Sequence, residues 1–288
     1  MKKSKWMLLG AMGIFGTVGI FKKWIPMGAG EVAFARGVLG LLFLVVIMPV
    51  TRQKFDRSAI KKNLLLLCLS GGAMGLNWVL LFESFDYTSV ATATVCYYMA
   101  PLFLILASPL VGEKLTGKKL LCVGTALVGL VFVSGMTDGA MPGLSELKGI
   151  GFALGAALLY ATVMLLNKKL SPIPAYDKTI LQLGAAAVVI LPVVLLRGGF
   201  DISAMTGSTW AFLLIVGFVH TGVAYALYFG SMRDLQAHTI AVFSYLDPVI
   251  AVVVSSLLPS EPAMTVWGIL GTVLILGSAL YSELPAKK

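Results

Sequence analysis

The chain has 288 residues, of which 58% are hydrophobic and only 12% are charged, and its formal net charge is +9. One soluble core could not enclose so much apolar surface, so the composition excludes an ordinary water-soluble domain and indicates a protein that is solvated by lipid. The mean hydropathy of +0.94 agrees with this.

Ten apolar segments of about 20 residues follow one another along the chain, and each is long enough to cross the hydrocarbon core as a helix. The loops between them are short, which leaves no room for a separate soluble domain. The sequence therefore predicts an all-α membrane protein with ten transmembrane helices. The expected spans are residues 6–21, 31–50, 64–84, 89–111, 120–136, 149–167, 179–196, 210–231, 237–258 and 264–282.

The basic residues predict the orientation, because Lys and Arg near span ends are retained on the cytoplasmic side of a membrane. With the N-terminus inside, 17 of the 22 basic residues fall on that side. Both the N- and the C-terminus are therefore expected to be cytoplasmic. This sorting and the anionic lipid headgroups nearby account for the positive charge, so no nucleic-acid partner is expected.

The two halves of the chain repeat each other. Pro101 and Pro248 occur in matching apolar surroundings 147 positions apart, and Arg36 corresponds to Gln182 at an offset of 146. Such self-similarity indicates that one unit has been duplicated.

The predicted division is a first five-helix repeat at residues 1–136, a connector at 137–148 and a second repeat at 149–288. Since each repeat has an odd number of spans, the second copy is expected to be inverted in the membrane. Inverted repeats with an interrupted helix in each half are typical of secondary transporters, whose substrate site lies near the repeat interface.

No cofactor or metal site is expected. The three cysteines, Cys68, Cys96 and Cys122, all fall in spans and show no Cys-x-x-Cys spacing. Residues 112–119 have the outline of a phosphate-binding loop, but Lys119 stands where Ser or Thr would hold Mg²⁺.

Five segments resemble the EamA-type branch of the drug/metabolite transporter (DMT) superfamily. They are Phe-Ala-Arg-Gly at 34–37, Leu-Asn-Trp at 76–78, Phe-Glu-Ser-Phe-Asp-Tyr-Thr at 82–88, Tyr-Tyr-Met-Ala-Pro at 97–101 and Gly-Glu-Lys-Leu-Thr at 112–116. The resemblance implies a ten-helix carrier of the inner (cell) membrane that exports an amino acid, a nucleobase or another metabolite.

The chain departs from a symmetric pattern at two places. Gln182 replaces the arginine found at Arg36, and Glu261 is displaced by one position from the equivalent of Glu113. These departures indicate that the two halves do not bind substrate alike.

Interrupted helices are expected at Pro101 and Pro248. Each proline lacks an N–H and frees the carbonyl oxygen four residues earlier, and such groups are tolerated at membrane depth only beside protein or a water-lined cavity. Because residues three apart share a helix face, Tyr98 lies with Pro101 and Tyr245 with Pro248. We therefore expect the two prolines to act as kinks that control access to a cavity, with a purely structural kink as the alternative.

Aromatic residues near the middle of spans are expected to line that cavity, where a ring can hold an amino acid side chain or an organic cation. The alternative is an interfacial aromatic belt, which is expected for Trp6, Trp24, Trp210 and Tyr281. The expected substrate-binding residues are Asn77, Trp78, Tyr98, Tyr225, Tyr228 and Tyr245.

A charged group inside a span costs roughly 2.5–3.5 kcal/mol on insertion scales, so each such group needs a partner or a purpose. Arg36 is expected to tether helix ends, with a substrate carboxylate as the alternative ligand. Glu83 is expected at the outer rim of the third span. Asp247 could accept a proton or hold Na⁺ if it is buried, and His238 could titrate near neutral pH.

The sequence thus predicts a secondary transporter, proton-coupled or facilitative, that exports an amino acid or a similar small polar metabolite as a monomer or homodimer in the lipid bilayer. One alternative is an exporter of organic cations or drugs held in an aromatic cage. A lipid-modifying intramembrane enzyme is the alternative from another class, and the lack of a clustered His/Asp/Glu motif argues against it.

Overall fold

The computed structural model describes residues 2–50, 55–107, 109, 115–137, 143–232, 235 and 237–283, although the side chains of a few residues within these ranges, His238 among them, are outside the description. All regular elements in this part of the chain are helices, which confirms the predicted all-helical fold. Six of the described helices are long and apolar enough to cross a membrane. They are α1 (Lys2–Lys23), α2 (Ala29–Val50), α3 (Arg57–Ser84), α7 (Leu144–Lys168), α8 (Ala175–Leu196) and a continuous helix made of α9 (Gly207–Leu214), η2 (Ile215–Val223) and α10 (Ala224–Met232).

The other expected spans fall on shorter helices. Two of these spans are interrupted, and each is divided into two short helices just before its proline. The elements are α4 (Val90–Tyr97), α5 (Ala100–Leu106), α6 (Gly117–Val133), α11 (Ala237–Ser244), α12 (Leu246–Leu257) and α13 (Val266–Glu283).

A three-residue hydrogen bond precedes the interruption in each half. The backbone N–H of Tyr98 is shared between the Thr94 and Val95 carbonyls, at 3.1 Å each, and that of Tyr245 donates to the Val242 carbonyl at 3.3 Å. These three-residue bonds tighten the last turn before each break. The expected break before each proline is therefore present, whereas its role in gating stays a prediction.

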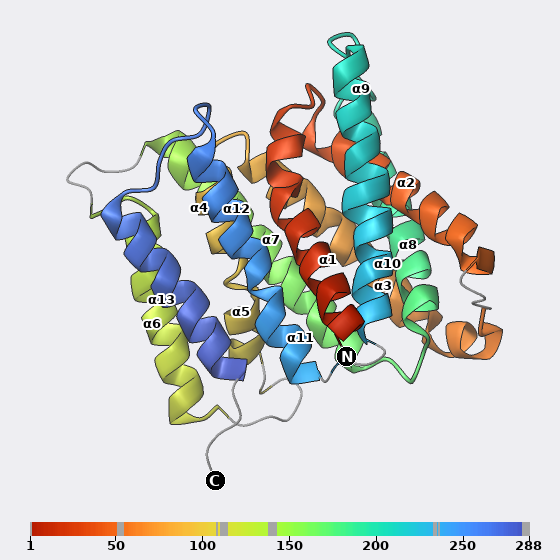
Figure 1. Cartoon of the computed structure of the whole chain (residues 1–288), viewed down its shortest axis with the longest axis horizontal. Helices are drawn as coiled ribbons and strands as arrows, with labels where there is room; N and C mark the ends of the chain where they lie inside the picture. Colours follow the sequence, from red (N-terminus) through yellow and green to blue (C-terminus); the bar gives the residue numbers. More distant parts are fainter. Residues whose placement is uncertain are drawn as a thin grey trace.

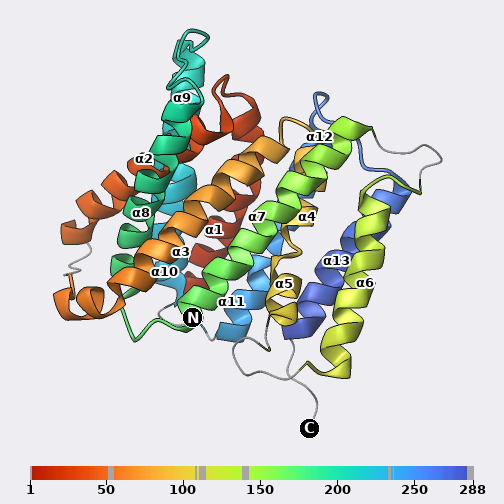
Figure 2. The ribbon, with the colours of Figure 1, turned by 180° about the vertical axis from the view of Figure 1, so that it is seen from behind.

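Helices from both halves alternate across the molecule (Figure 1). α6 and α13 lie side by side at one edge, and the same pairing is seen from behind (Figure 2). Glycines permit this close approach, since a Cβ on Gly129 would lie only 2.8 Å from the Gly271 carbonyl oxygen. α1 begins and α13 ends at the same end of the molecule, so the two ends of the described chain share one side.

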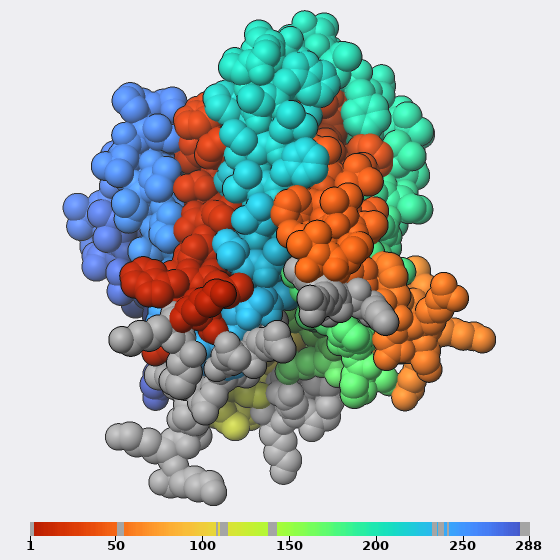
Figure 3. Space-filling model, turned by 45° about the vertical axis from the view of Figure 1, so that its right-hand side comes forward, coloured from red at the N-terminus to blue at the C-terminus, as the bar shows by residue number. Residues whose placement is uncertain are grey.

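The outer surface of the long helices is apolar. Val46 is 72% exposed, Leu65 72% and Val188 70%. In Figure 3 the continuous helix α9–η2–α10 runs along the surface from one end of the molecule to the other, between α1 and α2. Apolar side chains exposed around long helices are expected where lipid replaces water as the solvent.

The π-helical segment η2 packs closely on α2. A Cβ on Gly217 would collide with the side chain of Leu39, and one on Gly222 would collide with Phe43. The wider turn is supported by Thr221, whose hydroxyl donates to the Val216 carbonyl five residues earlier at 3.1 Å. The absence of a side chain at these glycines thus brings η2 against the helix that carries Arg36.

One boundary differs from the expectation. The connector was expected at 137–148, whereas α7 begins at Leu144. Helix formation extends into the polar residues before the apolar span because Gly143 marks its N-cap position and Glu146 supplies a negative charge in the first turn.

Candidate functional site

A cavity lies in the centre of the bundle, between helices of both halves. Its walls come from α1, α2, α3, α7 and α10 and from the interrupted helices α4 and α11–α12, and about 1030 Å³ is empty, including the part open to solvent. The second expected span contributes to these walls through Arg36.

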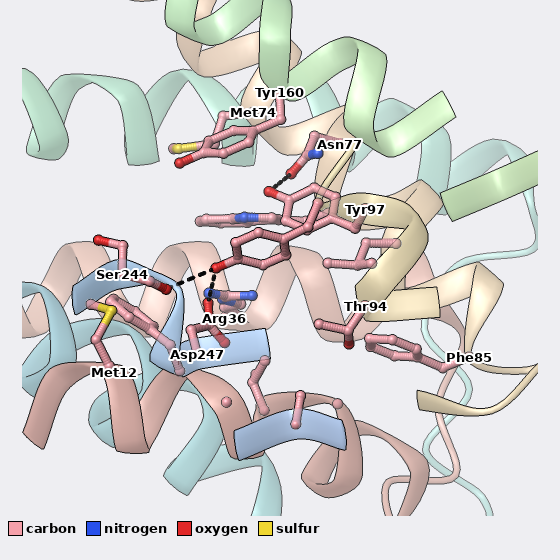
Figure 4. Close-up of a pocket in the computed structure, with 18 of the residues that line it drawn as sticks. Met12, Arg36, Met74, Asn77, Phe85, Thr94, Tyr97, Tyr160, Ser244 and Asp247 are labelled. Carbon is pink, nitrogen blue, oxygen red and sulfur yellow. Dashed lines mark hydrogen bonds between the residues drawn. The ribbon is translucent and has the colours of Figure 1, made fainter. Parts of the chain in front are cut away.

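Tyr98 links the two interrupted helices across this cavity. Its hydroxyl lies 3.0 Å from Asp247 Oδ2 and 3.3 Å from the backbone oxygen of Ser244 (Figure 4). Ser244 precedes Pro248 by four residues, so its carbonyl oxygen is the one that the proline leaves without a helical donor. A hydroxyl has one proton, and Tyr98 can therefore donate to only one of these two acceptors at a time.

Arg36 is the buried cation of the cavity. The residue is 5% exposed, its Nε donates to Thr221 Oγ1 at 3.0 Å, and its guanidinium carbon lies 4.2 Å from the centre of the Trp78 ring. Among the described residues, its two terminal nitrogens make no hydrogen bond and no carboxylate lies within 4.0 Å of them. Contacts with Thr221 and Trp78 therefore orient this guanidinium, and its terminal donors have no hydrogen-bond partner among the described residues.

Tyr97 and Tyr160 form a second aromatic wall. Their rings are stacked with centroids 5.4 Å apart, and the Tyr97 hydroxyl donates to Asn77 Oδ1 at 3.5 Å. The amide nitrogen of Asn77 donates to the Ala156 carbonyl at 2.6 Å. Asn77 thus borders the cavity with both polar atoms engaged by protein, which suits it to hold α3 against α7 and to orient Tyr97.

The third wall is formed by α10 together with α1. Tyr225 and Tyr228 line the cavity, and the ring of Phe15 meets them edge-on with centroid distances of 5.4 Å and 6.4 Å. On its other side Tyr225 stacks on Phe229 at 5.7 Å. These contacts fix the ring orientations, so the cavity has a rigid aromatic surface.

The expected site residues are thus mostly brought together. Asn77, Trp78, Tyr98, Tyr225 and Tyr228 line the cavity with Arg36 and Asp247. Their role in binding stays a prediction.

Three expected residues lie elsewhere or outside the description. Tyr245 packs on Tyr98, with ring centroids 5.9 Å apart, and is not among the lining residues. Glu83 accepts a hydrogen bond from Arg197 Nη1 at 2.9 Å, which places it in an ion pair outside the cavity lining. His238 belongs to α11, but its side chain lies outside the described part of the structure.

The sequence reasoning missed several lining residues. Tyr97 is next to a predicted cavity residue at the end of α4, and it borders the cavity on the side of Asn77. Tyr160 and Phe15 were detectable as aromatic residues near the middle of their spans, the criterion that selected Tyr225. No sequence signal could have shown that Arg36 contacts Thr221, which lies on η2.

The model of the EamA-like transporter family matches two parts of the chain, residues 2–135 and 147–282. A protein of Bacillus subtilis (strain 168) described as the uncharacterized transporter YxxF is 31% identical over 249 residues, which are 85% of this chain and 78% of the relative. The protein RarD of Salmonella typhi is 26% identical over 249 residues, which are 83% of this chain and 81% of RarD.

A solved crystal structure of a protein also has a similar fold. Its TM-score to this chain is 0.64 at 17% sequence identity, and the match covers 98% of this chain and 96% of the other. At this identity the likeness concerns the fold.

Proposed function

Because the chain belongs to the EamA-like transporter family, we propose that it exports an amino acid or a similar small polar metabolite through the central cavity by alternating access. Transport across a membrane is the function of the family, and the substrate and direction are the proposal. The observation that carries it is the buried Arg36, whose terminal nitrogens face a cavity that also holds Asp247.

The proposed architecture is two inverted repeats of five helices each, at residues 1–136 and 149–288, in the inner membrane with both termini cytoplasmic. Two matches of one family model support the duplication. The two interrupted helices, α4–α5 and α11–α12, support equivalent roles for Pro101 and Pro248. An inverted repeat can exchange the conformations of its halves, which opens a central site to each side in turn.

The charges of the cavity favour a zwitterionic substrate. A guanidinium can bind a carboxylate through two parallel hydrogen bonds, and Arg36 has its terminal donors available for this. An ammonium group can be held by Asp247 and by the faces of Tyr98 and Tyr225 through cation–π attraction. An amino acid carries both groups on one carbon atom.

Asp247 is the proposed proton carrier. When this carboxylate is charged, the Tyr98 hydroxyl donates to it; once protonated, Asp247 can donate to Tyr98, which then donates to the Ser244 carbonyl. Proton binding would thereby move the hydrogen bond that Tyr98 donates from the Asp247 side chain to the Ser244 carbonyl at the break. This couples protonation to the segment that is proposed to move.

The experiment compares metabolites retained and secreted by cells that express the protein, the Arg36→Gln variant or neither. A solute that accumulates outside only with the unaltered protein is then tested in proteoliposomes by counterflow. Equal secreted metabolites in all three strains, together with no counterflow of any common amino acid, would refute the proposal.

The aromatic surface favours a second candidate, the export of organic cations. Tyr97, Tyr98, Tyr160, Tyr225 and Trp78 all present ring surface to the cavity. A cation needs no guanidinium partner, so replacing Arg36 would weaken amino acid transport but preserve or improve cation transport. The same variant therefore decides between the two substrates.

A further inference from the structure

Charged side chains gather beyond the end of the cavity that is farther from the N-terminus. Gly19, Phe85 and Ala251 line the cavity near this end, and Gly19 packs so closely that a Cβ there would lie 3.1 Å from the Phe85 ring. One helical turn beyond Gly19, α1 ends with Lys22 and Lys23.

Lys22 and Lys23 connect α1 to two other segments, the linker between α3 and α4 and the segment after α12. Lys22 forms an ion pair with Asp86, in the turn after α3. Lys23 Nζ lies 2.5 Å from Glu261 Oε1 and 3.4 Å from the Thr88 carbonyl oxygen. The pair with Glu261 joins the first half of the chain to the second half.

Glu261 is the most buried member of this group. Its side chain is 1% exposed, and its Oε2 accepts from the Val90 backbone N–H at 2.9 Å and from Ser255 Oγ at 3.2 Å. It therefore holds together the start of α4, the end of α12 and the end of α1. A buried carboxylate is stable only while such partners remain, so separating these helices exposes an uncompensated charge unless water enters.

We propose that Lys23 and Glu261 form the gate that closes the cavity on the side opposite the N-terminus, and that the cavity opens to that side when their ion pair breaks. This inference rests on the proposed alternating access. With this gate, the state described here is the one closed to that side.

The test measures how readily a cavity residue is labelled from each side of the membrane. Ala251→Cys places a thiol at the cavity wall in a chain whose Cys68, Cys96 and Cys122 are replaced by serine. A membrane-impermeant maleimide is applied to right-side-out and to inside-out vesicles. Size-exclusion profiles of the purified variants verify folding.

Lys23→Gln and Glu261→Gln are each expected to raise the labelling rate several-fold from the side opposite the N-terminus. The double variant is expected to match the single ones, since each removes the same interaction. Lys23→Gln removes the ion pair but leaves Glu261 accepting from the Val90 N–H at the start of α4. Its effect therefore reports on the ion pair and not on the hydrogen bond that caps α4. Arg197→Gln is the matched control, because it also breaks an ion pair, that of Arg197 with Glu83. The Arg197 side chain is 55% exposed, and neither residue lines the cavity.

The gate would be overturned if folded Lys23→Gln showed unchanged labelling from that side while labelling from the N-terminal side showed the cavity to be accessible. Additive effects of the two substitutions would also overturn it. An absence of labelling from both sides in every variant would overturn alternating access through this cavity, and the gate with it.

Discussion

The hydroxyl group of Tyr98 lies 3.3 Å from the carbonyl oxygen of Ser244, the backbone group that Pro248 leaves without a helical donor. A residue of one broken helix can thus donate to the carbonyl oxygen that the break in the other leaves free. The same hydroxyl lies 3.0 Å from Asp247 Oδ2. The interruption, the cavity and its carboxylate are consequently linked through one side chain.

Replacing Tyr98 with Phe removes this link while keeping the ring. A hydrogen bond contributes about 1 kcal/mol, so we expect transport to fall several-fold with a smaller change in substrate affinity. Transport rates and equilibrium binding in proteoliposomes measure the two effects separately. Tyr281→Phe is the control, because Tyr281 is 51% exposed and lies outside the cavity lining. Equal transport in both variants would contradict a coupling role.

Pro248→Ala should impair transport more than membrane insertion. Alanine restores an N–H that can bond to the Ser244 carbonyl, which makes α11 and α12 more continuous and removes the need for Tyr98. The measurement is the transport rate per inserted molecule. Pro192→Ala is the control, since Pro192 lies inside α8 but not at the cavity. Unchanged transport in the Pro248 variant would reduce this break to a packing feature.

Replacing Arg36 should weaken amino acid binding by roughly 10- to 100-fold. A hydrogen bond to a charged group contributes about 1.5–3 kcal/mol, and about 1.4 kcal/mol corresponds to a factor of ten. Arg36→Lys keeps the charge but not the two-pronged geometry, so it should recover only part of the affinity. Arg197→Gln should leave binding unchanged. Full affinity in Arg36→Gln would assign this residue to helix tethering alone.

Asp247→Asn should remove the response of transport to a pH gradient. Asparagine preserves the size of the side chain but cannot carry a proton between the two sides. Exchange of labelled for unlabelled substrate at equal pH and saturating substrate should continue, because it needs no net proton movement, although loss of the carboxylate that holds the ammonium group weakens substrate binding. Glu83→Gln, which alters a carboxylate outside the cavity lining, should keep the response. A pH-driven flux that survives in Asp247→Asn would move proton coupling elsewhere.

Gly217→Ala should destabilise the protein, because the added methyl group would collide with Leu39. Overpacking of this kind costs typically about 1–3 kcal/mol. We expect a lower thermal unfolding midpoint in detergent, and also weaker substrate binding, since α2 carries Arg36. Gly184→Ala in α8 is the control, as no atom lies within 4 Å of the new Cβ. Equal midpoints would show that α2 and η2 separate without cost.

Much of the fold could be predicted because lipid imposes strict requirements on a chain. Every backbone polar group must be satisfied within a span, so long apolar segments become helices. The all-helical structure and the breaks before Pro101 and Pro248 follow from this rule and from the missing N–H of proline. Because residues three apart share a helix face, the position of Tyr98 beside the interruption at Pro101 could be predicted in the same way.

Contacts between distant segments had to come from the tertiary structure. Arg36 meets Thr221 only because glycines bring α2 against η2, and hydropathy does not encode which helices become neighbours. Tyr97 and Tyr98 also border one cavity although adjacent residues of a helix point about 100° apart, because Tyr97 reaches Asn77 on α3 and Tyr98 reaches Asp247 on α12. Hydrophobicity thus determined which segments cross the membrane, and packing between their surfaces determined which polar groups face the cavity.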